Sequence, residues 1–262
     1  LTLKAMKQFI SAVVGVFLLV IAATSAQEDY CDPDLCDPGE PHVGCNNPNE
    51  PSRNCPPGDD TKKFVFTDAE KQLLVDLHNE YRNKVAKGEL DWLPKAANMV
   101  AMSWDDDLAY LAELNSNQCA ANHDKCRNTK KYPDSGQNID TMITNATSVK
   151  TEDAIRDLVQ GWWDERHEAN AKMVKKMYKP SPNVKVLHFT MLTRDIANRV
   201  GCGMVQYKKQ GWIWINLVCN YSYTNMLKTP IYAQGEPCSQ CTSGCDAKFD
   251  GLCNTDEPVD LS

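Results

Sequence analysis

The sequence predicts an α+β protein that is secreted and cross-linked by disulfide bonds. Three segments with helical periodicity precede two strand-like runs that are joined by a short turn. Helices followed by paired strands favour an α+β fold or a three-layer α-β-α sandwich. Twelve cysteines lie downstream of an apolar N-terminal segment, and an even number of cysteines in an exported chain favours complete pairing.

The N-terminus has the pattern of a secretory signal peptide. Lys4 and Lys7 precede an apolar run that ends in small residues, the last of which is Ala26. This pattern predicts cleavage after residues 1–26 and an extracellular mature protein. A transmembrane anchor is the alternative, but the run is at the short end for a bilayer span, so we expect no integral membrane span in the mature chain.

Residues 27–63 are expected to form an N-terminal extension that is stapled by disulfides. The segment is rich in Pro, Asp, Asn and Gly and has almost no apolar periodicity. Burial alone therefore cannot hold it in place. Its four cysteines must fix it to itself or to the rest of the protein.

Helix signals predict where the three helices begin. Thr67 and Glu70 have the spacing of a capping box, and Gly88 supplies a stop for the first helix. Ser103 is predicted to cap a second helix that runs towards Cys119. A third helix is expected to start at Thr151.

The C-terminal half of the chain predicts a β-hairpin. Residues 200–207 and 212–221 are β-type runs, and Lys208-Lys209-Gln210-Gly211 joins them. Cys202 and Cys219 lie on these neighbouring runs and could bridge them.

Two further patterns bear on modification and partners. Asn145-Ala146-Thr147 is expected to be a glycosylation acceptor. Asn220-Tyr221-Ser222 has the same pattern but follows a run that is predicted to be a buried strand, so Asn220 is not expected to be modified. The formal net charge of −7 argues against a nucleic-acid partner, because phosphate binding requires clustered basic residues.

Several short motifs occur in the order found in CAP proteins (cysteine-rich secretory proteins, antigen 5 and pathogenesis-related proteins). The motifs are Leu77-His78-Asn79-Glu80-Tyr81-Arg82, Gly136-Gln137-Asn138, Trp162-Trp163-Asp164-Glu165, His188-Phe189-Thr190 and Cys219-Asn220-Tyr221. The chain therefore resembles this family over about residues 30–232. Its first eight cysteines, together with His123-Asp124-Lys125-Cys126-Arg127, are most similar to insect antigen 5 from venom or saliva.

The resemblance implies a disulfide pairing that spacing alone leaves open. For the first eight cysteines it implies Cys31–Cys45, Cys36–Cys126, Cys55–Cys119 and Cys202–Cys219. It also implies that residues 64–232 form the CAP domain, a three-layer α-β-α sandwich. Residues 233–262 resemble the hinge-like tail of cysteine-rich secretory proteins, which implies Cys238–Cys245 and Cys241–Cys253. A zinc knuckle is the competing interpretation of the tail, and secretion favours disulfides.

CAP proteins carry a cavity lined by two histidines and two acidic residues. The matching positions here are His123, His188 and Glu165, with Gln137 at the second acidic position. Two neutral imidazoles can bind Zn²⁺ or Cu²⁺, although no cofactor is required. Gln137 cannot act as a general base, which disfavours hydrolysis. The alternative is that both histidines only hydrogen-bond a polar core, and His78 is expected to be structural.

Two other functional patterns are disfavoured by the sequence. Ser135 and Ser222 could serve as nucleophiles, but neither lies in a nucleophile-elbow pattern. Pro57-Gly58-Asp59 stands where some relatives from blood feeders display Arg-Gly-Asp, and that tripeptide occurs nowhere in this sequence. Integrin binding through Arg-Gly-Asp is therefore disfavoured.

Together these features predict a secreted antigen 5-like protein of saliva or venom that is not an enzyme. Its expected action is to bind small mediators or lipids, a metal ion, or a host extracellular protein of haemostasis or immunity. The alternative is a metal-dependent secreted hydrolase, or a redox activity, at the His123/His188 cavity.

Overall fold

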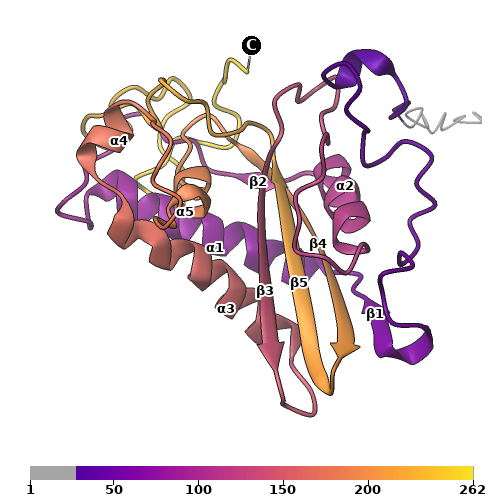
Figure 1. The fold of residues 1–262 in the computed structure, drawn as a ribbon. Coiled ribbons are helices and arrows are strands. Elements are labelled where there is room, and N and C mark those ends of the chain that lie inside the picture. The colour runs from indigo at the N-terminus through magenta and orange to yellow at the C-terminus, as the bar shows by residue number, and fades with distance from the viewer. Residues whose placement is uncertain (1–27, 262) are drawn as a thin grey trace, which may run out of the picture.

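A five-stranded sheet forms the middle layer of this computed structural model, which describes residues 28–261 (Figure 1). At its centre, β4 (Arg199–Lys209) and β5 (Trp212–Tyr221) form the predicted antiparallel hairpin. β3 (Gly136–Thr144) pairs antiparallel with the free edge of β5. Along the other edge of β4 lie β2 (Ser103–Trp104), which is parallel, and β1 (Thr61–Lys63), which is antiparallel.

Helices cover both faces of the sheet and complete the predicted α-β-α sandwich. α2 (Asp106–Ser116) packs on one face, against β4 and β5. α1 (Asp68–Lys87), α3 (Thr151–Asp164) and α5 (Leu187–Leu192) lie on the other side. In the described part of the chain, four short helical segments complete the fold: η1 (Pro33–Leu35), η2 (Gly58–Asp60), η3 (Glu165–Glu168) and α4 (Ala171–Lys175). No helix within residues 28–261 is long and apolar enough to cross a bilayer.

Two glycines allow α2 to approach the sheet closely. A Cβ atom on Gly203 would lie 2.3 Å from the Cα and N atoms of Glu113, and one on Gly201 would lie 2.2 Å from the N atom of Ala109. Real Cβ atoms do not approach backbone this closely. The absence of side chains at these positions of β4 therefore sets the distance between helix and sheet.

The helix starts agree with the sequence except at α2. Thr67 and Glu70 form the predicted capping box, and Gly88 ends α1 with a φ of 75°. The prediction that Ser103 caps the second helix is wrong, because Ser103 pairs with β4 in β2. Asp105 is the cap, and its Oδ1 atom accepts from the backbone amides of Asp107 and Leu108, both at 3.1 Å.

A buried arginine ties α1 to two loops. The guanidinium of Arg82 is fully buried and donates to the backbone carbonyls of Val100, Leu192, Arg194 and Asp195. Burial lowers its pKa to about 9. Since no carboxylate among residues 28–261 forms an ion pair with it, carbonyl dipoles supply its stabilisation.

The cysteines attach both ends of the described chain to the sandwich. The structure joins Cys31–Cys45, Cys36–Cys126, Cys55–Cys119, Cys202–Cys219, Cys238–Cys245 and Cys241–Cys253. In the tail, Phe249 and Leu252 join the main hydrophobic core, and Lys87 on α1 forms an ion pair with Asp250. The predicted signal peptide lies outside the described residues.

Candidate functional site

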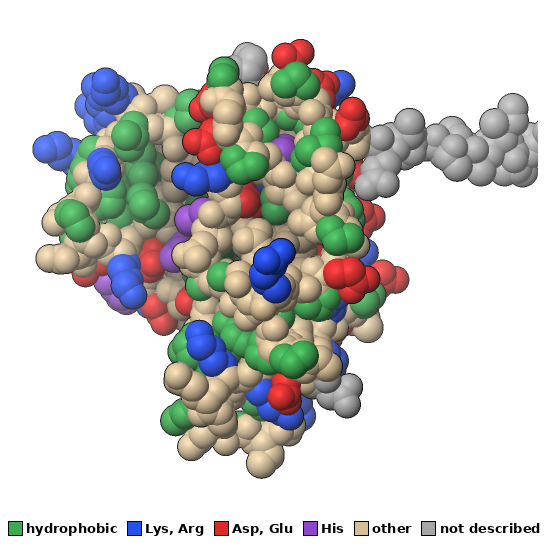
Figure 2. Space-filling view, turned by 45° about the vertical axis from the view of Figure 1, so that its right-hand side comes forward, with side chains coloured by type: hydrophobic (Ala, Val, Ile, Leu, Met, Phe, Trp, Pro, Cys, Tyr) green, Lys and Arg blue, Asp and Glu red, His purple; other side chains and the backbone are tan. Residues whose placement is uncertain are grey.

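The four residues predicted for the cavity all line one hollow in the structure. It has a volume of about 560 Å³ and lies between β3, the end of α3 and the segment that leads into α5. His123, Gln137, Glu165 and His188 belong to its wall. Figure 2 shows histidine side chains beside acidic ones at the edge of a depression left of centre.

Hydrogen bonds around Gln137 fix the state of His123. The amide nitrogen of Gln137 donates to the Asp124 carboxylate and to Asn220 Oδ1, both at 2.9 Å. Its Oε1 atom therefore faces His123 Nδ1, 2.7 Å away. Because that oxygen can only accept, Nδ1 carries a proton, and in the corresponding neutral tautomer the lone pair is on Nε2.

Glu165 fixes the second imidazole in the same way. Its carboxylate accepts from His188 Nδ1 at 2.8 Å and from the backbone amide of His188 at 2.9 Å. Within the described residues, no hydrogen bond is formed by the Nε2 atom of either His123 or His188. An acceptor on Nδ1 is the usual arrangement that prepares the other ring nitrogen to bind a metal.

His78 lies behind the cavity and is structural. Its Nδ1 atom donates to the carbonyl of Leu74 at 2.7 Å, and its Nε2 atom accepts from the hydroxyl of Tyr221 at 2.9 Å. The amide of Asn138 donates to that hydroxyl and to the carbonyl of His188, both at 3.2 Å. Burial lowers the pKa of His78 to about 4, so the ring is neutral.

Asp140 is a cavity residue that the sequence reasoning missed. It is half-buried on β3, and burial raises the pKa of its carboxyl. Gly161 on α3 approaches it so closely that an added Cβ would lie 3.1 Å from Asp140 Oδ2. The sequence did contain a signal for Asp140: it lies two residues after Asn138 on the same strand, and residues two apart on a strand face the same side of the sheet. The cavity thus contains a second carboxylate, but not at the position of Gln137.

A second grouping of potential metal ligands is already satisfied. Within the described chain, the only three His, Cys or acidic ligand atoms that lie within 4.8 Å of one another belong to Cys36, His42 and Cys126. The two cysteines form a disulfide, so they offer no thiolate. His42 contacts the carbonyl of Asn128 at 2.8 Å and accepts from the amide of Gly44 at 2.9 Å. This cluster is therefore structural.

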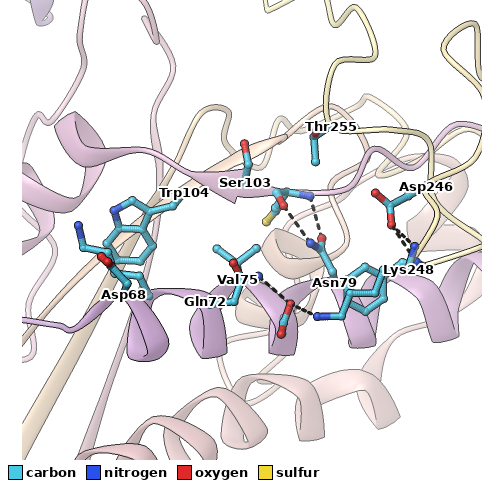
Figure 3. Close-up of a pocket in the computed structure, with 13 residues that line it drawn as sticks. Asp68, Gln72, Val75, Asn79, Ser103, Trp104, Asp246, Lys248 and Thr255 are labelled. Atoms are coloured by element: carbon cyan, nitrogen blue, oxygen red, sulfur yellow. Dashed lines mark hydrogen bonds and ion pairs between the residues drawn. The ribbon is translucent and has the colours of Figure 1, made fainter.

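A second hollow of about 510 Å³ lies between α1, β2 and the C-terminal tail (Figure 3). Lys248 from the tail forms an ion pair of 2.7 Å with Asp76 on α1. Asn79 exchanges two hydrogen bonds with the backbone of Met102. The ion pair joins the tail to the sandwich, and the hydrogen bonds join α1 to the segment that precedes β2.

The remaining predicted positions have simple surroundings. The hydroxyl of Ser135 donates to the carbonyl of Tyr132, and that of Ser222 contacts Asn198. Among the residues that the structure describes, neither serine is hydrogen-bonded to a histidine. Asn145 is exposed just after β3, whereas Asn220 is fully buried.

Comparisons with known proteins agree with this architecture. Residues 75–221 match the model of the "Cysteine-rich secretory protein family". Venom allergen-1 of Aedes aegypti is 36% identical over 94% of this chain and 95% of its own. The antigen 5 like allergen Cul n 1 of Culicoides nubeculosus is 37% identical over 68% of this chain and 84% of its own. Venom allergen 5 of Rhynchium brunneum is 34% identical over 84% of this chain and 95% of its own.

Solved structures share the fold. Na-ASP-1 superposes with a TM-score of 0.61 at 28% identity and covers 78% of this chain and 50% of its own. NaASP2, crystallised with Zn²⁺, gives a TM-score of 0.56 at 24% identity over 75% of this chain and 98% of its own.

Proposed function

Since this chain belongs to the cysteine-rich secretory protein (CAP) family, we propose that it is an extracellular antigen 5-like protein that binds ligands without turnover. One observation carries this proposal: both cavity imidazoles are held with Nδ1 occupied and Nε2 available. The amide of Gln137 stands where a general base would be needed. The family, the six disulfides and the leader-like N-terminus all support secretion, with saliva or venom as the source.

Zn²⁺ or Cu²⁺ fits the donors of this cavity. Neutral imidazole nitrogens suit both ions, and His123 and His188 would be the protein ligands. A bound ion would supply a Lewis acid that a donor group of a small ligand could share. Gln137 and Glu165 orient the two rings through Nδ1. The assignment rests on this chain's own donors, because the relative crystallised with Zn²⁺ shares only the fold.

Calorimetric titration of the purified protein with Zn²⁺ and with Cu²⁺ tests the metal site. We expect His123→Ala and His188→Ala each to weaken binding at least about tenfold, and the double variant to abolish it. His167→Ala is the matched control, because that histidine stacks on Trp92 away from the cavity wall. Equal metal binding by the wild type and the double variant would contradict the metal proposal.

Asp140 favours a second candidate function, a metal-dependent hydrolase. A half-buried carboxylate with a raised pKa has the character of a general base, and it lies in the same cavity as the histidines. Ester, peptide and phosphoester substrates should be assayed with the metal-loaded wild type, Asp140→Asn and Gln137→Glu. Hydrolysis that is lost in Asp140→Asn would establish the enzyme, whereas inactivity of the wild type and of Gln137→Glu would exclude it for these substrates.

The binding proposal also covers host molecules. Immobilised protein incubated with plasma, platelets and lipid extracts should retain a protein, mediator or lipid that mass spectrometry identifies. Wild type and the His123→Ala/His188→Ala variant should be compared, because retention by both locates the ligand on the surface loops. An empty capture from all three sources would contradict a binding function.

A further inference from the structure

Residues 169–194, which run from the end of η3 to just beyond α5, have a charge unlike that of the whole chain. The chain has a formal net charge of −7, yet no acidic residue occurs between Glu168 and Asp195. Five exposed lysines lie within it: Lys172, Lys175, Lys176, Lys179 and Lys185. In the described part of the molecule, none of these five forms an ion pair.

A second loop extends the same surface. The backbone amide of Lys228 donates to the carbonyl of Met177 at 2.7 Å, and Asn225 Nδ2 donates to the carbonyl of Leu187 at 3.0 Å. These bonds hold the loop that carries Leu227 and Lys228 against the lysine-rich segment. Lys228 is exposed and forms no ion pair with any described residue, so it is the sixth lysine of this group.

Apolar side chains are exposed among these lysines. Leu227 is 53% exposed, Leu187 47% and Tyr178 38%, although Met173 and Met177 of the same segment are buried. In Figure 2, basic side chains border an apolar area at the upper left, on the side of the molecule where Figure 1 shows α4. The six lysines and these three apolar residues are called the basic-apolar surface below.

We propose that the basic-apolar surface docks on anionic lipid membranes. Lysines near a membrane are attracted to anionic headgroups, and exposed leucine and tyrosine side chains can enter the boundary between headgroups and acyl chains. A soluble polyanion would use the lysines but would gain nothing from Leu187 and Leu227. Lys185 and Leu187 also line the cavity of His123 and His188, so docking would place the cavity wall next to lipid.

Vesicle co-sedimentation tests this surface. The full-length mature protein should bind vesicles of phosphatidylcholine mixed with phosphatidylserine, bind phosphatidylcholine alone weakly, and dissociate at high salt. Each lysine contributes about five-fold to partitioning, the equivalent of about 1 kcal/mol. Lys175→Glu/Lys176→Glu/Lys179→Glu should therefore lose at least about a hundred-fold. The control variant Lys62→Glu/Lys150→Glu/Lys209→Glu makes the same charge change elsewhere and should retain most of the binding.

Two further arms separate a membrane from other anions. Leu187→Ser/Leu227→Ser should reduce vesicle binding about ten-fold without changing the charge. Circular dichroism and thermal unfolding verify that each variant is folded. Three results would overturn the proposal: no vesicle binding by the wild type, equal vesicle binding by the leucine variant, or tight binding of soluble heparin fragments without vesicle binding. Loss of metal binding in the histidine variants leaves these results unchanged, so the two proposals fail separately.

Discussion

Replacing His78 by glutamine should remove a pH-dependent part of the protein's stability. Burial lowers the pKa of this ring from 6.5 to about 4 in the folded protein. Between these two pH values the unfolded chain binds a proton that the folded protein does not bind. The stabilisation from keeping this ring neutral is therefore complete above the unfolded pKa and is lost as the pH falls towards the folded pKa.

The size of the effect follows from these two pKa values. His78 should cost the wild type about 2 kcal/mol of unfolding free energy between pH 7 and pH 5, and about 3 kcal/mol by pH 4. Glutamine does not titrate, so His78→Gln lacks this loss. At neutral pH the variant should be less stable, because the hydrogen bonds to Leu74 and Tyr221 are disturbed. The difference between the two proteins should narrow as the pH falls.

Guanidinium unfolding with intact disulfides, followed by tryptophan fluorescence from about pH 7 to pH 4, measures this difference. Tyr221→Phe is the matched control, since it removes one hydrogen bond from His78 but leaves the ring buried and titratable. It should be less stable at every pH and keep most of the wild-type pH dependence. Parallel curves for wild type and His78→Gln would refute the reasoning.

Three further predictions concern the scaffold and can be checked by the same unfolding experiments. Gly203→Ala should lose about 1–3 kcal/mol of stability or more, because the added Cβ meets the backbone of α2. Gly161→Ala, whose Cβ meets only a side-chain oxygen, should change stability by no more than about 1 kcal/mol. Equal losses in the two variants would contradict the packing argument. Arg82→Met should cost about 3–5 kcal/mol because several buried carbonyls lose their donor, and a stable variant would show that water replaces the guanidinium. Burial opposes ionisation of Glu257, but hydrogen bonds from Ser243 and Thr242 outweigh it and lower the pKa to about 2. The stabilisation from Glu257 should be present above about pH 4.5 and fade towards pH 2, and a Glu257→Gln variant with unchanged pH dependence would refute this.

Local signals predicted the start of α1 but not that of α2. The capping box of Thr67 and Glu70 is contained within four consecutive residues, so the sequence alone specifies it. Ser103 and Asp105 are both good caps, and the choice between them depends on β4, whose Arg199 pairs with Ser103. A partner almost a hundred residues away therefore decides where α2 begins.

In the candidate site, too, some residues could be predicted from local sequence and others depend on tertiary packing. His123, Gln137, Glu165 and His188 could be named from their motifs, and the structure places all four in one cavity wall. Asp140 carries no motif, and its proximity to α3 depends on how that helix packs on β3. The basic-apolar surface likewise requires two loops that only tertiary hydrogen bonds bring together.

The contacts of residues 99–101 have a consequence for shortening the chain. Arg82 donates twice to the carbonyl of Val100, while the Met99 carbonyl and the Ala101 amide both bond to the backbone of Cys253. All three residues are almost completely buried. A chain that ended near residue 232 would leave two inward-facing backbone groups without partners and uncover the apolar wall beneath Phe249 and Leu252. The sandwich and its cysteine-rich tail thus share one hydrophobic core, and recombinant production should retain both.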